Sequence, residues 1–241
     1  MPTVKHGKWK SSDLGSWISD FEDKTQDFEI TPKQLRWLPQ KIQEYQFFHT
    51  GIKTMMGAGS PQMKNGLSIG QYSFTKNMTD IKTALYSADG DILLVPQQGT
   101  LLCTSEFGKL RVPPQEILVI PRGVKFSIDS ENGEPARGWI TECYKGHFAI
   151  PDLGPIGSNG LANERDFSTP VAAYEDLEEK WTICVRYHSR SFQYEQDHSP
   201  YDVVAWHGNY YPFKYDLTKF NTMGSISFDH PAQSWAPTHL F

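Results

Sequence analysis

The sequence of 241 residues contains few cysteines, and its only three, Cys103, Cys143 and Cys184, lie far apart with no Cys-x-x-Cys pair. An odd number of widely spaced cysteines argues against a disulfide framework and a zinc knuckle, so we expect three reduced thiols in a protein core. No apolar run approaches the roughly 20 residues of a membrane span, and the N-terminal sequence lacks the apolar segment of a signal peptide. We therefore expect a soluble protein of a reducing, cytoplasmic compartment, with no membrane as partner.

Basic residues are also too few for a nucleic-acid-binding protein. Lysine and arginine number 23 against 28 aspartates and glutamates, which gives a net charge of −5, and the basic residues form no cluster. This balance argues against nucleic acid as the main partner. Hydrophobic residues make up 38% and aromatic residues 13% of the chain, so it can bury a sizeable core and fold.

Short strands dominate the chain from residue 65 onward, because apolar and polar residues alternate there between turn signals rich in glycine, proline and aspartate. Strands at such regular spacing indicate an antiparallel sandwich or barrel. The predicted strands span residues 66–74, 91–96, 101–105, 110–112, 117–120, 124–128 and 139–144, with a turn at residues 89–91.

Two irregular stretches follow the predicted strands. Residues 151–167 contain three glycines, two prolines and two asparagines, and residues 203–217 are rich in aromatic residues. Such segments form closely packed loops, and loops are where sites are built. The fold class that we expect is therefore mainly β, a sandwich with long irregular loops. Residues 1–29 are polar and weakly patterned, and we expect an atypical, poorly ordered or loosely docked segment.

Residues 91–99 and 116–126 resemble the two metal-binding segments of a cupin barrel. Cupins usually carry a His-x-His pair and a glutamate in the first segment and Pro-x-Gly-x-x-His in the second. Here Pro121 and Gly123 are present, Phe126 stands at the histidine position, and no His-x-His precedes Gly99. The resemblance implies a cupin-like jelly roll over residues 30–225 that lacks the metal site and has an apolar interior, and Asp89 and Asp91 fit a turn better than a calcium site.

The histidines form no HExxH motif and no compact set of metal ligands. We expect solvated or surface positions for most of them, with His147 at the end of a strand; the surface set is His6, His49, His188 and His198. His207 is crowded by aromatic residues, glycine and asparagine. We interpret it as a buried histidine bonded to a backbone carbonyl, with direct catalysis as the alternative.

His230 ends an alternating segment, residues 225–229, and an imidazole facing a cavity there could take a proton from a phenol. From composition alone it reads as a surface histidine.

Long blocks of the chain, in order, resemble the homogentisate 1,2-dioxygenase family. The blocks include residues 34–37, 57–59, 65–67, 87–91, 95–97, 106–109, 122–129, 151–167, 173–176, 199–200, 203–215 and 228–230. The resemblance implies an extradiol-type enzyme that cleaves the ring of homogentisate with O2 to maleylacetoacetate, in tyrosine and phenylalanine catabolism. It also implies His230 as the catalytic base, and a homo-oligomer of trimers paired into hexamers.

The family's Fe(II), held by two histidines and one glutamate, is implied as cofactor, but its ligands lie in a C-terminal half that this chain lacks. No metal ligand is therefore assigned to His207 or to any other residue here. The chain departs from the family pattern over residues 1–29 and again after Pro231. We expect a shortened gene model, splice variant or fragment, in which residues 226–241 begin the catalytic domain and the chain alone is inactive.

Two other functions compete with this one. The chain could be a non-catalytic cupin-like scaffold or oligomerisation module, and iron content would separate this alternative from the enzyme. A cupin isomerase acting on sugar nucleotides fits less well, because Phe126 and the missing His-x-His leave it without a site.

Overall fold

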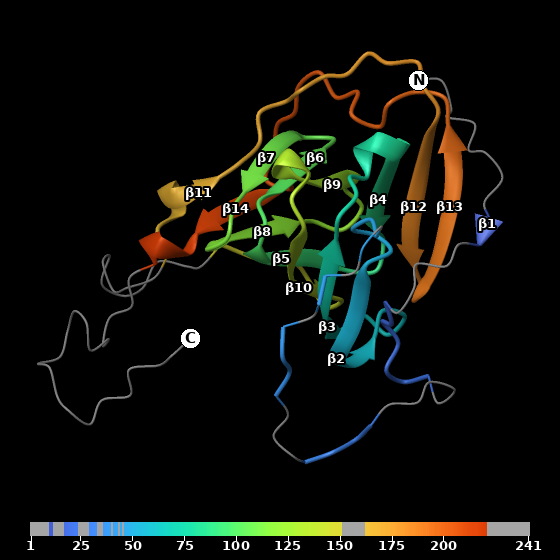
Figure 1. Ribbon diagram of the computed structural model, residues 1–241, viewed down its shortest axis with the longest axis vertical. Coiled ribbons are helices and arrows are strands. Elements are labelled where there is room, and N and C mark those ends of the chain that lie inside the picture. Colours follow the sequence, from blue (N-terminus) through green and yellow to red (C-terminus); the bar gives the residue numbers. More distant parts are fainter. Residues whose placement is uncertain are drawn as a thin grey trace, which may run out of the picture.

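The computed structural model of the chain is a sandwich of two β-sheets (Figure 1). It describes residues 10–11, 17–23, 29–32, 36–39, 41–42, 44, 46–150 and 162–220. One sheet has the strand order β1-β13-β12-β4-β9-β6-β7, and the other has the order β11-β14-β8-β5-β10-β3-β2. Among the described residues the only helices are short 3-10 turns, and none is long and apolar enough to cross a membrane.

The bounds of the strands and turns follow the chain in order. They are β1 (Lys10–Ser11), β2 (Ile52–Ser60), β3 (Asn65–Phe74), η1 (Thr79–Ile81), β4 (Thr83–Ser87), β5 (Asp91–Gln98), β6 (Leu101–Ser105), β7 (Gly108–Val112), β8 (Glu116–Ile120), β9 (Phe126–Ser130), η2 (Glu131–Gly133), β10 (Ala136–Cys143), η3 (Glu164–Asp166), β11 (Phe167–Ser168), β12 (Trp181–Tyr187), β13 (Arg190–Gln196), β14 (Phe213–Asp216) and η4 (Leu217–Lys219).

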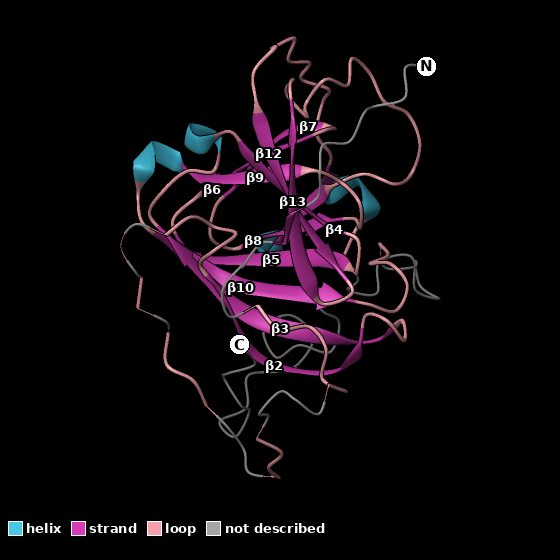
Figure 2. Cartoon of the chain, turned by 90° about the vertical axis from the view of Figure 1, so that its right-hand side faces the viewer, coloured by secondary structure: helices cyan, strands magenta, loops and turns pink. Residues whose placement is uncertain are grey.

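Strands β3 to β10 form a jelly roll. They pair in the order β3-β10-β5-β8 in one sheet and β4-β9-β6-β7 in the other, so the chain crosses repeatedly between the sheets. This double-sheet arrangement of eight strands is the jelly roll found in cupins. In Figure 2 the strands β8, β5, β10, β3 and β2 follow one another below the other sheet. The predicted mainly β, cupin-like sandwich is confirmed.

All seven predicted strands are present, as β3, β5, β6, β7, β8, β9 and β10, and β7 and β10 begin two and three residues earlier than predicted. Strand β9, predicted over residues 124–128, begins later, at Phe126. The cause is the preceding turn, in which the N–H of Val124 donates to the carbonyl of Pro121 at 3.3 Å. The turn therefore uses Val124, and the strand can start only after it.

Additional strands extend both sheets. β12 pairs with β4 in parallel, while every other pairing between strands in the described part of the chain is antiparallel. β12 and β13 form a hairpin with His188 in its turn, and the side chains on its inner face are buried.

Apolar side chains from both sheets fill the interior of the sandwich. Phe126 is completely buried, and its ring lies 6.3 Å from that of Phe48, which also packs against Tyr72 and Phe74. The position that carries a metal-binding histidine in cupins is therefore part of an aromatic core here. Aromatic packing of this kind stabilises the contact between the sheets.

The three cysteines are free thiols, as expected. Cys103 and Cys184 are buried, and burial raises the pKa of Cys184 to about 11, so that thiol stays protonated at neutral pH. Cys143 is partly exposed, so the prediction of a core position is wrong for this residue. It lies near the end of β10, on the side of the strand that does not face the core.

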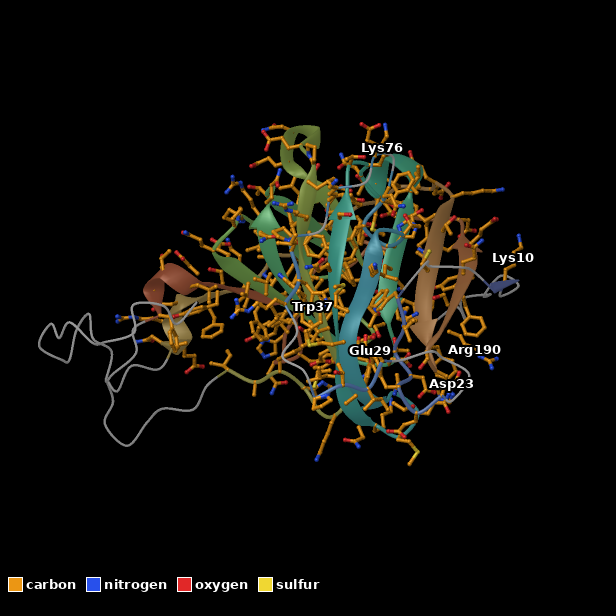
Figure 3. The ribbon with its side chains drawn as sticks, turned by 60° about the horizontal axis from the view of Figure 1, so that its bottom comes forward. Lys10, Asp23, Glu29, Trp37, Lys76 and Arg190 are labelled. Atoms are coloured by element: carbon orange, nitrogen blue, oxygen red, sulfur yellow. The ribbon has the colours of Figure 1, made fainter. Side chains whose placement is uncertain are left out.

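Part of the polar N-terminal segment packs against the sandwich. Trp17 is only 4% exposed and Ser19 is completely buried, and neither position was predicted from the polar composition of residues 1–29. Thr54 of β2 accepts a hydrogen bond from the N–H of Ile18 at 2.8 Å and donates one to its carbonyl at 2.9 Å. Lys10 of β1 lies beside the β12–β13 hairpin (Figure 3).

His49 is buried, so the prediction of a solvated position is wrong. Its ring stacks on that of Phe47 with 5.8 Å between the centroids, and its Nδ1 has no hydrogen-bond partner in the described part of the chain. The turn at residues 47–51, in which the N–H of Gly51 donates to the carbonyl of Phe47 at 2.8 Å, directs the ring inward. Burial lowers the pKa of His49 from 6.5 to about 4.

We expect acid to destabilise the protein through His49. The unfolded chain takes up the proton near pH 6.5 and the folded protein only near pH 4, so stability is complete above pH 6.5 and falls as the pH is lowered to 4. The loss should reach about 3 kcal/mol, measured by urea unfolding at a series of pH values. His49→Phe should flatten this dependence, whereas His188→Gln on the exposed hairpin should leave it unchanged. A profile equally steep in His49→Phe would contradict the prediction.

Candidate functional site

A polar cluster surrounds the buried carboxylate of Asp91 at the start of β5. Its Oδ1 accepts a hydrogen bond from the N–H of Arg122 at 2.9 Å, and its Oδ2 accepts one from the N–H of Phe148 at 3.1 Å. The Nδ1 of His147 lies 3.1 and 3.2 Å from the same two oxygens. Asp91 therefore ties together three chain segments. We call Asp91, Arg122, His147 and Tyr210 the Asp91 cluster.

The turn before β5 places Asp91, and it confirms the turn predicted at residues 89–91. The hydroxyl of Ser87 accepts hydrogen bonds from the N–H groups of Asp89 and Gly90, at 3.1 and 3.2 Å. A Cβ at Gly90 would lie 2.4 Å from the carbonyl oxygen of Cys143, so only glycine lets the two backbones approach this closely.

Asp89 holds the tip of the β12–β13 hairpin. Its two carboxylate oxygens accept hydrogen bonds from the N–H groups of His188 and Ser189, at 2.7 and 2.9 Å. Both turn residues have positive φ angles, which a two-residue hairpin turn requires and which cost energy in residues other than glycine. The carboxylate offsets part of that cost, so Asp89 has a structural role here.

His147 exposes one side of its imidazole while the other side is fixed. The side chain is 51% exposed, and the bond from Nδ1 to Asp91 leaves Nε2 available. The ring packs edge-on against Tyr210 with 5.1 Å between the centroids, and the hydroxyl of Tyr210 donates to the carbonyl of Arg122 at 2.7 Å. An imidazole oriented by a buried carboxylate can accept a proton or act as a ligand.

Burial, reinforced by the charge of Asp91, raises the pKa of Tyr210. The phenol therefore remains a hydrogen-bond donor at neutral pH, which suits its bond to Arg122.

A second polar network lies inside the sandwich and consists of Ser19, Ser87, Glu142 and Arg186. Glu142 is completely buried, and its carboxylate accepts hydrogen bonds from Ser87 at 2.5 Å and from Ser19 at 3.2 Å. Arg186 donates to the hydroxyls of Ser19 and Ser191, and its guanidinium lies 4.4 Å from the centre of the Trp17 ring. Burial raises the pKa of Glu142, and the positive charge of Arg186 opposes that rise. This network pins residues 17–19 to β10 and β12.

The described residues do not fit a mononuclear iron centre. Within them, no group of three or more histidine, cysteine, aspartate or glutamate side chains lies close enough together to hold a metal ion. The Asp91 cluster offers one imidazole and one carboxylate, whereas a two-histidine, one-carboxylate centre needs a further histidine.

The histidines singled out from the sequence lie apart from one another. His230 and His6 fall outside the described residues. His188 is exposed and His198 lies at the surface between Asp197 and Asp202, as expected.

His207 is exposed, so its predicted burial is wrong. The indole N–H of the neighbouring Trp206 fixes this loop instead, since it donates to the carbonyl of Phe107 at 2.8 Å and its ring packs edge-on against that of Phe107. A wide indole covers more apolar surface than an imidazole, and it therefore turns inward in preference to His207.

The contact between Asp91, His147 and Tyr210 was not predicted from the sequence. They are separated by 56 residues and more along the chain, and their contact depends on the pairing of β5 with β10 and on the return of residues 203–211. Two features of the sequence marked parts of this site, namely the turn at residues 89–91 and the aromatic run at 203–217. Neither feature indicated which other segment it would contact.

A family model and curated relatives agree on one family. A family model described as "Homogentisate 1,2-dioxygenase N-terminal" matches residues 1–217. Curated proteins named homogentisate 1,2-dioxygenase are 47% identical in Emericella nidulans, over 97% of this chain and 52% of that protein, and 51% identical in Caenorhabditis elegans, over 89% and 48%. A third, from Drosophila melanogaster, is 50% identical over 83% of this chain and 46% of its own length. The chain thus spans about half the length of these relatives.

Similar solved structures include cupins. One is a cupin superfamily protein from Desulfitobacterium hafniense, 19% identical, covering 47% of this chain and 94% of that chain with a TM-score of 0.34. Another is a protein with a cupin-2 domain from Shewanella frigidimarina, 19% identical, covering 32% and 70% with a TM-score of 0.28.

Proposed function

This chain belongs to the homogentisate 1,2-dioxygenase N-terminal family, and from that premise we propose that it forms the N-terminal half of an enzyme that opens the ring of homogentisate with O2. The observation that carries the proposal is the match of the family model over residues 1–217, together with identities of 47–51% to curated relatives over most of the chain. The reaction proposed is the formation of maleylacetoacetate in tyrosine and phenylalanine catabolism, in the cytoplasm.

The proposed enzyme also needs iron, and we place the residues that bind it in the part of the relatives that this chain does not span. A bound Fe(II) ion would activate O2 and orient the substrate. Since the described residues do not fit such a centre, we derive no step through the metal from them. A general base alone contributes about 10²–10⁴-fold to a rate, which is far too little to open an aromatic ring. We therefore propose that the 241-residue chain is inactive by itself.

Two groups of this chain have roles in the proposal. His230 is the base that accepts the phenolic proton of the substrate, as the family resemblance implies. The Asp91 cluster has a positioning role, because it fastens His147 and Phe148, which follow β10, to Tyr210, which precedes β14. The jelly roll thus holds these two segments together.

The proposed assembly is a homo-oligomer of trimers paired into hexamers. In this assembly the jelly roll of residues 30–225 precedes the catalytic domain that residues 226–241 begin, and residues 1–29 form the atypical N-terminal segment. Homogentisate and O2 are the only small-molecule partners that the proposal requires.

Oxygen uptake tests the proposed function directly. We expect no uptake from the 241-residue chain with homogentisate and ferrous ion. A chimera that joins residues 1–231 to the remaining C-terminal part of the Emericella nidulans enzyme should consume O2 and form a product with the absorbance of maleylacetoacetate, because it restores the full length of the family.

The parental Emericella nidulans enzyme serves as the positive control. Uptake by the short chain would overturn the proposed inactivity. A folded chimera that binds iron but turns over no homogentisate would overturn the proposed activity and favour the scaffold alternative.

A further inference from the structure

A cavity of about 550 Å³ lies on the outer face of the sheet that contains β6, β7 and β9, under the chain at residues 175–177. Its volume is within the range of small-molecule sites in proteins. No residue of the Asp91 cluster lines it. The lining residues that matter below are Lys82, Leu102, Thr104, Lys109, Arg111, Asp129, Glu175, Leu177 and Trp181.

Strand register builds the floor of this cavity. Residues that pair across strands point to the same face, so Arg111, Leu102 and Asp129 form one row across β7, β6 and β9. Lys109 and Thr104 form the start of the next row. Two cations therefore stand side by side on β7, next to an apolar and a hydroxyl side chain on β6.

The roof of the cavity is held by hydrogen bonds rather than lying loosely over the sheet. The N–H of Glu175 donates to the carbonyl of Tyr201 at 2.9 Å, and the N–H of Ser199 donates to the carbonyl of Leu177 at 2.9 Å. At the start of the same segment, a Cβ on Gly108 would lie 1.9 Å from the carbonyl oxygen of Val171. Only glycine at position 108 lets the segment approach β7 this closely.

The acidic groups in the cavity already have donors. Asp129 accepts from the N–H of Thr79 at 3.1 Å and from its hydroxyl at 2.5 Å. Glu175 accepts from the hydroxyl of Ser199 at 3.0 Å and pairs with Lys109 at 3.3 Å. Their negative charge is therefore largely satisfied within the wall.

The cations have donor capacity to spare. Arg111 uses Nε and Nη2 on Glu131, two of the five N–H donors of a guanidinium. Lys82 pairs with Glu179 at 2.7 Å, and Lys109 pairs with Glu175, while an ammonium group has three donors. Counted with Glu131 and Glu179, the carboxylates balance the charge of these cations, so the attraction for a ligand comes from the N–H donors that Lys82, Lys109 and Arg111 leave unused. Such donors suit a ligand that carries oxygen acceptors.

We propose that this cavity binds a small organic carboxylate with an apolar body, its carboxylate between Lys109, Arg111 and Lys82 and its carbon skeleton against the leucines and Trp181. Leu102 and Leu177 supply apolar contact from the floor and the roof, and Trp181 closes one end with the Lys82 ammonium 5.7 Å from its ring centre. The ligand class follows from this combination of cations and apolar walls. The site is separate from the proposed ring-opening reaction and does not depend on it.

Phenylacetate is the probe that we would use to test the site. Titration of the 241-residue chain, followed by NMR, should shift the indole N–H signal of Trp181 with a saturable dependence in the millimolar range or below. The neutral analogue 2-phenylethanol should bind at least about tenfold more weakly, because it lacks the charge that the cations recognise. Added salt should weaken phenylacetate binding and leave the alcohol unaffected.

Two variants separate this site from nonspecific binding. Lys109→Met combined with Arg111→Met should weaken phenylacetate binding at least about tenfold, whereas Lys53→Met, on exposed β2 of the other sheet, should not change it. Thr104→Trp should block the cavity while the cations remain. Thermal unfolding shows whether each variant is folded.

The proposal is overturned if phenylacetate leaves the Trp181 signal unmoved. It is also overturned if folded Thr104→Trp and Lys109→Met/Arg111→Met proteins bind phenylacetate as the parent chain does. Neither result bears on oxygen uptake by the chimera.

Discussion

Replacing Arg186 by methionine is expected to lower the free energy of unfolding by about 3–5 kcal/mol, because the change leaves the buried carboxylate of Glu142 without a compensating charge. The Arg186 side chain is only 2% exposed and Glu142 is completely buried, so water cannot replace the lost partner. The same change removes the donors to Ser19 and Ser191 and the contact with Trp17. Urea unfolding at pH 7 measures the effect.

The effect of Arg186→Met should depend on pH in a defined direction. Burial already raises the pKa of Glu142, and Arg186 opposes that rise more strongly than the hydrogen bonds from Ser87 and Ser19 do. Without Arg186, Glu142 in the folded protein keeps its proton up to a higher pH than in the unfolded chain. The stability that this proton contributes is complete below the pKa of the unfolded chain and is lost as the pH rises through the pKa of the folded protein. The destabilisation should therefore be smaller near pH 5 than near pH 8.

The matched control is Arg190→Met at the exposed end of the same hairpin (Figure 3), which should change stability by less than about 0.5 kcal/mol. Adding Glu142→Gln to Arg186→Met should recover a large part of the loss, since it removes the uncompensated charge. Equal losses in the single and double variants would show that the arginine acts only through packing.

The part of the fold that could be predicted is the set of strands in which apolar and polar residues alternate along the sequence. Strand β10 shows both the strength and the limit of that signal, because every second residue from Ala136 faces the interior. The pattern located the strand from its apolar positions. It did not show that Glu142 occupies the last inward position, because that burial depends on Ser19 and Arg186, which are 123 and 44 residues away.

Errors in the histidine predictions have a similar cause. His49 and His207 both lie among aromatic residues, yet the first is buried and the second is exposed. The difference depends on which neighbour packs inward. His49 is buried together with Phe47, on which its ring stacks, whereas Trp206 occupies the inner position and His207 stays exposed. Composition around a histidine does not resolve this choice, because tertiary packing makes it.

The candidate site was predictable only as a set of segments. Aromatic content marked the segment 203–217, although its residues 213–216 form strand β14 and not a loop. The turn at residues 89–91 marked the position of Asp91. The contact of Asp91 with His147, and of His147 with Tyr210, follows from strand pairing and loop return over long distances in sequence. The identity of Phe126, in contrast, was informative by itself, since a phenylalanine at a ligand position indicates an apolar interior and the ring is indeed completely buried.

Replacing His230 by asparagine in the active chimera is expected to lower kcat by roughly 10²–10⁴-fold, the usual contribution of a general base. We propose His230 as the group that removes the phenolic proton of homogentisate, and asparagine cannot accept that proton. Iron content and the KM for homogentisate should change little, because the role assigned to His230 is proton transfer and not binding. The acidic limb of the pH profile of kcat should disappear, and added imidazole should restore part of the rate.

The control for His230→Asn is His207→Asn, which removes an exposed imidazole from the aromatic loop and should leave kcat within about twofold. A His230→Asn protein that loses its iron would place this histidine at the metal rather than at the phenol. A large loss in His207→Asn with little change in His230→Asn would transfer the base to the second loop and overturn the assignment. Because the two variants differ only in which imidazole is removed, the pair of pH profiles identifies the residue that accepts the proton.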